Sequence, residues 1–302
     1  MAATHRTSIE RILCPIDFSD ISHHALTHAA AIARWYEARL TLLYVFVNLP
    51  AVDLPPVVLE DGDRARTFDQ MRHFAAGIPP EVQVDCQVQE ELLVHDAILA
   101  QVDTTAADLL VLGTHGRSGF QRLFLGSVTE KVIRKVKCPT LIVPPRAPDR
   151  ALNAPVEFQR ILCPIDFSEG SLAALEYATN LAEEADGQLT LLHVTEMPAA
   201  LTQEPFLVDD ELVRIREAAV NDAGRKLASL IPENARAYCT IETAVAEGRA
   251  YREILRRATE KKSDLIVMGV HGRGALDLLL FGSTTHHVIR ASACPVLIVR
   301  HG

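Results

Sequence analysis

The chain repeats itself, and this internal repeat constrains its fold more than any other feature of the sequence. RILCPIDFS at Arg11–Ser19 returns unchanged at Arg160–Ser168, and LTLLYV at Leu40–Val45 returns as LTLLHV at Leu189–Val194. Both pairs lie 149 residues apart. Self-similarity at a fixed spacing indicates one folding unit in two copies. The length agrees with this, because 302 residues exceed what a single hydrophobic core usually organises.

A glycine-containing stretch is repeated as well. GTHGRSGFQRLFLGS at Gly113–Ser127 returns as GVHGRGALDLLLFGS at Gly269–Ser283, and each has G-x-x-G, nine further residues and then G-S. An apolar run precedes each stretch and helix-spaced apolar residues follow it, so we interpret both as a strand, a glycine loop and a helix start. Such a loop suits a phosphate, because backbone N–H groups and the positive end of the helix dipole point the same way.

The repeat also sets the expected domain boundaries. We expect one domain at 1–146 and a second at 155–302, joined by the proline-containing linker Pro145–Pro155. The two glycine stretches lie 156 residues apart rather than 149, so the second copy has seven extra residues before its glycine stretch. We place these residues in a loop or a helix.

Apolar runs and helix-spaced segments alternate in both copies. Strands that alternate with helices imply an α/β fold with a mostly parallel sheet and right-handed crossovers. In the first copy we expect strands at Ile12–Ile16, Leu40–Val47, Val82–Val88 (near an edge), Leu109–Leu112 and Thr140–Val143, helices from about Ile21 and at Asp63–Ala76 and Leu92–Val102, and a loop at Asn48–Glu60. In the second we expect strands at Ile161–Ile165, Leu189–Val194, Ala237–Ile241, Leu265–Met268 and Val296–Val299, helices from Leu172 and at Leu212–Leu230 and Arg249–Lys261, and a loop at Thr195–Val208.

Composition excludes several classes of protein. The net charge is −9 and no basic run is present, which argues against a nucleic-acid surface. No apolar segment approaches the roughly 20 residues of a membrane helix, and the N-terminus lacks a signal-peptide core, so we expect a cytoplasmic protein. None of the six cysteines forms C-x-x-C, which favours buried thiols in a reducing compartment. His24 and His28 lie four residues apart but lack a third ligand, so we expect no metal site.

These motifs resemble the universal stress protein family over nearly all of both halves. The spacing G-x-x-G, nine residues, G-[ST] is the family's nucleotide-binding signature. Here it occurs twice, in register with an aspartate that ends the first strand and a Cys-Pro before the last. The resemblance implies two tandem doubly wound domains, each with a five-stranded sheet of order 3-2-1-4-5 flanked by helices. It also implies bound ATP, with Mg²⁺ as a candidate companion.

The expected position of the ligand follows from that strand order. Open α/β sheets bind ligands at the carboxyl ends of strands where the order reverses, here between the strands that end at Asp17 and Gly113. Glycines would let the backbone approach a phosphate, and Ser127 would both cap the helix and donate to phosphate. Candidate binding residues of the first half are Pro15, Ile16, Asp17, Val45, Leu112, Gly113, His115, Gly116, Arg117, Gly126, Ser127, Val128 and Thr129. By the resemblance, Pro15, Ile16, Val45 and Leu112 would line the adenine and ribose.

The second half offers an equivalent set, with one difference in charge. His286 replaces the acidic Glu130, and a glutamate near phosphates repels them whereas an imidazole does not. The candidate residues are Pro164, Ile165, Asp166, Val194, Met268, Gly269, His271, Gly272, Arg273, Gly282, Ser283, Thr284 and Thr285.

Other interpretations of these residues remain open. The glycines could form ordinary turns around a helix N-cap. Asp17 and Asp166 could simply be acids at a helix N-terminus. They could instead contact the ribose of a nucleotide, or contact its phosphates through a bound cation. His115 and His271 could touch phosphate or cap the loop, and Arg117 and Arg273 could contact phosphate or face solvent.

We expect a tandem universal stress protein that binds ATP and acts as a stress-response regulator without catalytic residues. A P-loop, a complete dinucleotide fingerprint and protein-kinase motifs are all missing from the sequence. One alternative is a slow ATPase or phosphotransferase, which needs a base near the γ-phosphate such as His115, His271 or Glu130. The other is an interaction module that binds no nucleotide.

Partner expectations follow from the resemblance. The two domains would pack as an internal pseudo-dimer, with Thr140–Val143 against Val296–Val299, since a bare edge strand favours pairing. A further homodimer is a second expectation.

Overall fold

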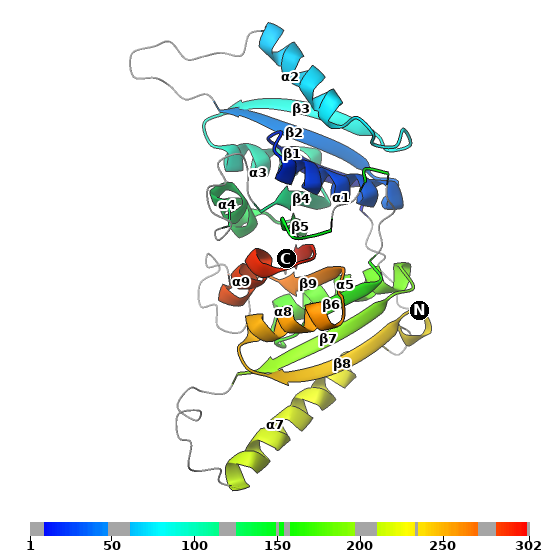
Figure 1. Cartoon of the computed structure of the whole chain (residues 1–302), viewed down its shortest axis with the longest axis vertical. Helices are drawn as coiled ribbons and strands as arrows, with labels where there is room; N and C mark the ends of the chain where they lie inside the picture. Colours follow the sequence, from blue (N-terminus) through cyan, green and yellow to red (C-terminus); the bar gives the residue numbers. More distant parts are fainter. Residues whose placement is uncertain are drawn as a thin grey trace. The chain divides into compact units, whose positions relative to one another are not determined.

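A computed structural model describes residues 9–47, 61–114, 125–148, 151–153, 158–196, 210–232, 235–270 and 282–300. The chain divides into two compact units, whose main parts are residues 1–156 and 157–291. Each unit has a sheet flanked by helices (Figure 1). The fold is therefore α/β, as the alternation of strands and helices predicts.

The first unit is a doubly wound parallel domain. Its strands lie in the order β3-β2-β1-β4-β5, and all of the neighbouring pairs are parallel. Two helices lie on the path of the chain outward to β3, and two others lie on its path back. Because the crossovers are right-handed, the first two helices cover one face of the sheet and the other two cover the opposite face. The strands are β1 (Arg11–Ile16), β2 (Arg39–Val47), β3 (Val84–Glu91), β4 (Leu109–Gly113) and β5 (Thr140–Val143), and the helices are α1 (Asp20–Tyr36), α2 (Asp61–Phe74), α3 (Val94–Thr105) and α4 (Ser127–Lys135).

The second unit repeats this topology in the order β8-β7-β6-β9-β10. The pairs β6–β7, β6–β9 and β7–β8 are parallel. A short 3-10 helix, η1 (Ala235–Ala237), precedes β8. The strands are β6 (Arg160–Pro164), β7 (Gln188–Thr195), β8 (Thr240–Glu247), β9 (Leu265–Gly269) and β10 (Val296–Val299), and the helices are α5 (Glu169–Glu184), α7 (Asp210–Ser229), α8 (Ala250–Glu260) and α9 (Ser283–Ala291).

The core explains why the central strands are continuous apolar runs. Leu13, Leu42 and Leu110 of the first unit and Leu162 and Leu191 of the second are completely buried. Helices on both faces of a sheet leave these strands without a solvent-facing side, so alternation with polar residues is lost. Over the described ranges, we find no helix whose length and apolar character would let it cross a bilayer.

Two predicted strands are displaced in the structure. The strand expected at Val82–Val88 is β3, Val84–Glu91, and the one expected at Ala237–Ile241 is β8, Thr240–Glu247. Both lie at sheet edges, where exposed polar side chains extend the strand past the apolar pattern that marks its ends. The loop predicted at 48–60 and most of the loop predicted at 195–208 lie outside the described residues.

The segment that follows β5 is attached to the first unit at several points. The Nε2 of His24 in α1 donates to the carbonyl oxygen of Pro148 at 3.0 Å. Ten residues further along the same helix, Arg34 donates to the carbonyl oxygen of Asn153, also at 3.0 Å. The Leu152 side chain is close to Gly77, because a Cβ added to this glycine would lie 3.4 Å from Leu152 Cδ1. The connecting segment therefore runs beside α1 for most of the helix.

Candidate functional site

Two strand ends that the sequence predicts to converge are neighbours in the first sheet. β1 pairs directly with β4, with Ile12 opposite Leu109 and Leu13 opposite Leu110. The chain leaves β1 toward β2 on one side, whereas β4 lies on the other, so the strand order reverses between them. This is where doubly wound sheets hold ligands. Asp17 directly follows β1 and Gly113 ends β4.

The predicted adenine-side residues lie on three adjacent strands. Pro15 and Ile16 end β1, Val45 belongs to β2, and Leu112 belongs to β4. Ile16 and Leu112 are buried, whereas Pro15 and Val45 are partly exposed. The second half repeats this placement with Pro164 in β6, Ile165 directly after it, Val194 in β7 and Met268 in β9.

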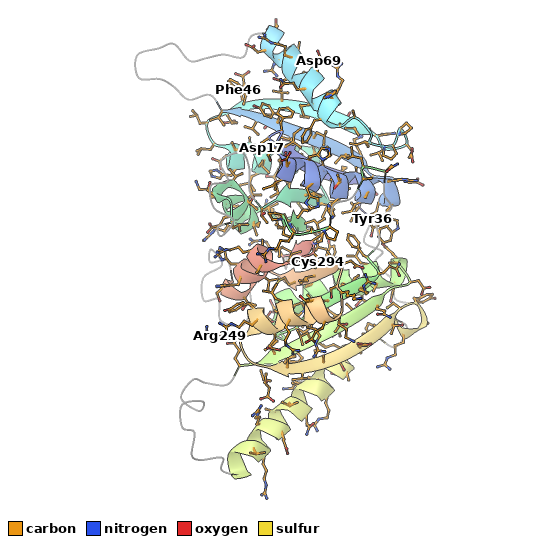
Figure 2. The ribbon with its side chains drawn as sticks, viewed as in Figure 1. Asp17, Tyr36, Phe46, Asp69, Arg249 and Cys294 are labelled. Atoms are coloured by element: carbon orange, nitrogen blue, oxygen red, sulfur yellow. The ribbon has the colours of Figure 1, made fainter. Side chains whose placement is uncertain are left out.

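Asp17 takes part in the turn that starts α1 (Figure 2). Its Oδ1 accepts hydrogen bonds from the backbone N–H of Ser19 at 3.1 Å and from the Ser19 hydroxyl at 2.5 Å. The Ser19 Oγ in turn accepts from the backbone N–H of Ser22 at 3.2 Å, which makes Ser19 the N-cap. Phe18 between them has φ of 61°, a left-handed conformation that non-glycine residues seldom adopt.

The same turn recurs in the second half. Asp166 Oδ1 accepts from the backbone N–H and hydroxyl of Ser168 at 3.0 and 2.5 Å, and Ser168 caps α5 through the N–H of Ser171. Phe167 has φ of 63°. The cap explains why α5 begins three residues before the predicted Leu172. In both halves the aspartate therefore has a structural role at the start of a helix, which the sequence left as an alternative to ligand binding.

The start of α4 is held against the end of β4. The N–H of Gly126 donates to the carbonyl oxygen of Thr114 at 2.7 Å, and the Thr129 hydroxyl donates to the carbonyl oxygen of Gly113 at 3.0 Å. Gly126 occupies the N-cap position and Ser127 is the first helical residue, so the prediction that Ser127 caps the helix is wrong. Gly126 has no side chain, so the cap makes no side-chain hydrogen bond to the first amides of the helix.

Equivalent contacts hold α9 in the second half. Gly282 N–H donates to the carbonyl oxygen of Val270 at 3.3 Å, and the Thr285 hydroxyl donates to that of Gly269 at 3.2 Å. Val128 and Thr284 are the second residues of α4 and α9, and Ser283 is the first residue of α9. In each half, a strand end and a helix N-terminus are thus joined by matching bonds.

Gly269 has a packing role that the sequence did not reveal. A Cβ at this position would lie 2.7 Å from both the carbonyl carbon and the oxygen of Gly170, and 3.1 Å from the nitrogen of Ser171. These are backbone atoms of the first turn of α5, so β9 approaches that helix more closely than any side chain allows. The glycine is required by this contact, whatever it does for a ligand.

Six predicted site residues belong to the glycine loops themselves. They lie outside the described residues: His115, Gly116, Arg117, His271, Gly272 and Arg273. Their proposed roles stay predictions.

An aromatic contact beside each aspartate was missed at the sequence level. Phe18 packs on Tyr44 with ring centroids 4.9 Å apart, and Phe167 packs on His193 at 4.8 Å. His193 also donates from Nδ1 to the carbonyl oxygen of Ile165 at 2.7 Å. The sequence feature that could have predicted this contact is the phenylalanine present in both Asp-Phe-Ser segments.

Four of the six cysteines are buried, as the sequence predicts, whereas Cys86 and Cys138 are partly exposed. Cys14 and Cys163 are completely buried in β1 and β6. Burial raises the pKa of the Cys14 thiol to about 12 and raises that of Cys163 as well. All six cysteines are free thiols. Within the described part of the chain, no three His, Cys, Asp or Glu side chains gather as metal ligands would.

Similarity to known proteins agrees with this arrangement. The model of the Universal stress protein family matches residues 8–144 and 157–300. The chain is 34% identical over 147 residues to the universal stress protein YxiE of Bacillus subtilis, covering 47% of this chain and 99% of that protein. It is 25% identical over 306 residues to the universal stress protein Rv2005c of Mycobacterium tuberculosis, covering 96% of each. A crystal structure of a universal stress protein from Archaeoglobus fulgidus has the same fold, with a TM-score of 0.64, 21% identity and 98% of both chains covered.

Proposed function

Because the chain belongs to the universal stress protein family, we propose that each half binds ATP beside its reversal of strand order and that the protein acts as a stress-response regulator. One observation carries the proposal. Each half joins the carboxyl end of its fourth strand to a helix N-terminus through Gly126 and Thr129, or through Gly282 and Thr285. Helix N-termini of this kind bind phosphates through their amides and dipole.

The phosphates and the nucleoside would contact different residues in each proposed site. The amides of Ser127, Val128 and Thr129 would hold the phosphates of the first half, and those of Ser283, Thr284 and Thr285 would hold them in the second. The N–H groups of Gly126 and Gly282 donate to the carbonyl oxygens of Thr114 and Val270, so these glycines would contribute by letting the phosphate come close to the backbone. Apolar residues at the strand ends would contact adenine and ribose. Asp17 and Asp166 support the turn next to the ribose, and Mg²⁺ would accompany the phosphates.

A charge test at the helix cap examines this proposal. Gly126→Asp places a carboxylate at the phosphate position, whereas Gly126→Asn places a neutral amide of nearly the same shape there. Gly126 has φ −57° and ψ 138°, and Asp and Asn are equally good N-caps, so both variants should fold. We expect ATP binding in the first half to be abolished by the aspartate and weakened much less by the asparagine. Gly282→Asp and Gly282→Asn give the same comparison in the second half.

Thermal shift and calorimetric titration supply the readout. At micromolar affinity, a 100-fold excess of ATP over Kd adds about 2.7 kcal/mol to stability, which is an easily measured rise in Tm. Unchanged ATP binding in both aspartate variants would refute the proposed positions. The absence of any ATP binding to the wild type would favour an interaction module instead.

The enzyme alternative has its own test. Repeated turnover of ATP to phosphate that disappears with Gly126→Asp would favour a slow ATPase or phosphotransferase. Pairing of the halves through Thr140–Val143 and Val296–Val299, a further homodimer and a cytoplasmic location stay predictions.

A further inference from the structure

Two arginines at the start of α8 carry positive charge that no ion pair neutralises. Arg249 is the N-cap of this helix and Arg252 lies in its first turn, and both side chains are exposed (Figure 2 labels Arg249). Across the described ranges, neither side chain forms an ion pair with a carboxylate. The arginines further along the same helix are paired instead: Arg256 with Glu253 at 2.6 Å and Arg257 with Glu260 at 3.9 Å.

The tyrosine between the two arginines brings their charges together. Arg252 donates from Nε to the Tyr251 hydroxyl at 3.0 Å, and its guanidinium carbon lies 5.8 Å from the centre of the tyrosine ring. Arg252 is also the main cause of a lowered pKa of Tyr251, and Arg249 acts in the same direction, so both guanidinium groups lie near this hydroxyl. Two like charges held beside one group repel each other, and a bound anion relieves that repulsion.

The ring of Tyr251 connects these charges to the start of α9. It stacks on the ring of His287, with centroids 4.6 Å apart, and His287 Nδ1 donates to the carbonyl oxygen of Ser283 at 2.7 Å. Ser283 is the first residue of α9 and a proposed phosphate-binding residue. Because α8 follows β8 and α9 follows β9, both helices start at the carboxyl edge of one sheet. Only the side chains of Tyr251 and His287 separate Arg252 from the proposed phosphate position in this series of contacts.

The acidic side chains at the start of α8 have other partners. Glu196 Oε1 accepts a hydrogen bond from the N–H of Ala250 at 2.8 Å, so the first amide of the helix already has an anionic partner. Glu253, on the first turn, pairs with Arg256. An additional anion would therefore interact with the two arginine side chains rather than with the first amide of α8.

The first half has different side chains at the matching positions. Leu93 is the N-cap of α3 as Arg249 is of α8, and neither cap makes a side-chain hydrogen bond. Leu93 is 50% exposed. Asp96 takes the place of Arg252 and lies 4.0 Å from Lys135. An apolar and an acidic side chain therefore occupy the places of the two arginines.

We propose that Arg249 and Arg252 attract the terminal phosphates of a nucleotide bound in the second half, so that this half selects longer phosphate tails more strongly than the first half does. The inference rests on the proposed function and concerns the choice among AMP, ADP and ATP. For charges roughly 10 Å apart in water, each pair changes the affinity by about twofold. Two arginines acting on the roughly two additional charges of ATP relative to AMP make about four such pairs, which together amount to about tenfold at low salt.

The experiment compares the two halves within one protein. With Gly126→Asp present, binding reports the second half, and with Gly282→Asp present, it reports the first. Kd for AMP, ADP and ATP is measured by calorimetry at pH 8.0 in about 20 mM and about 200 mM salt, first without Mg²⁺ and then with it. We expect the ratio of the AMP Kd to the ATP Kd to be about tenfold larger in the second half at low salt without Mg²⁺. This difference should shrink at high salt and with Mg²⁺, because both reduce the effective charge of the tail.

Variants assign the selectivity to the two arginines. Arg249→Gln with Arg252→Gln should lower the ratio of the second half to that of the first while changing the AMP Kd much less. Arg249→Lys with Arg252→Lys keeps the charges and should keep most of the ratio. Leu93→Arg with Asp96→Arg should raise the ratio of the first half. The matched control is Lys262→Gln, which removes an exposed positive charge beyond the other end of α8 and should leave the ratio unchanged.

The possible failures are distinct. Equal ratios in the two halves, or a high ratio that survives in the double glutamine variant, would overturn the inference and leave ATP binding intact. Circular dichroism of each variant verifies that α8 remains folded. If the wild type binds no ATP with or without Mg²⁺, the proposed function and this inference both fall.

Discussion

Replacing Gly269 by alanine separates the packing role of this residue from its proposed role in binding. The new Cβ would lie 2.7 Å from two backbone atoms of Gly170, well inside van der Waals contact. Backbone atoms at the start of α5 cannot rotate away as a side-chain end can. Overpacking of this kind costs about 1–3 kcal/mol, and removing a glycine from the unfolded chain offsets about 0.4–1 kcal/mol. We expect a net loss of about 1–2 kcal/mol, or a Tm lower by roughly 2–8 °C.

The matched control is Gly224→Ala in the same half. Gly224 lies within α7, and a Cβ there would meet nothing within 4 Å. Alanine is favoured over glycine in a helix interior by about 1 kcal/mol, so this variant should melt at or above the wild-type temperature. Both are measured by thermal and urea denaturation without ligand. If Gly269→Ala is as stable as the wild type but loses ATP, the glycine serves the ligand rather than the contact with α5, and the reasoning is refuted.

Three further predictions concern caps, thiols and the core. Ser19→Ala and Ser168→Ala should each lower stability by about 1 kcal/mol in denaturant melts, because each removes an N-cap bond; equal stability would show the caps to be dispensable. Burial raises the pKa of the Cys14 thiol to about 12, above its value in the unfolded chain. The contribution of this neutral thiol to stability is therefore complete below the unfolded pKa and is lost as the pH rises from that value through about 12. Thiol labelling at pH 8 should modify the partly exposed Cys86 before Cys14, and earlier labelling of Cys14 would contradict its burial. Leu42→Ala should cost about 2–5 kcal/mol in urea unfolding because the side chain is fully enclosed, and a loss under 1 kcal/mol would indicate that the core refills.

The repeated apolar segments were sufficient to predict most of the fold. Continuous runs such as Leu40–Val47 marked the central strands because neither of their faces meets water. The edge strand β8 was placed several residues too early, because its exposed polar side chains dilute the pattern. Spacing alone also could not distinguish Gly126 from Ser127 as the cap of α4, since the choice depends on backbone angles.

The candidate site was predictable to the level of elements but not of contacts. The order of the strands brings Asp17 and Gly113 to neighbouring strand ends, as the repeat and the resemblance implied. The sequence could not show that the carboxylate of Asp17 bonds to Ser19, because an acid at that position suits a ligand and a helix turn equally well. The close approach of β9 to α5 at Gly269 likewise depends on three-dimensional packing.

The attachment of the connecting segment to α1 bears on how the halves can be separated or exchanged. Pro148 and Asn153 bond to His24 and Arg34, so this stretch belongs chemically to the first half although it precedes the second. A chimera that grafts a foreign second half should therefore keep the native chain through Asn153. A junction placed before Pro148 would remove the hydrogen bonds that this stretch makes to α1, the helix that Ser19 caps with the support of Asp17.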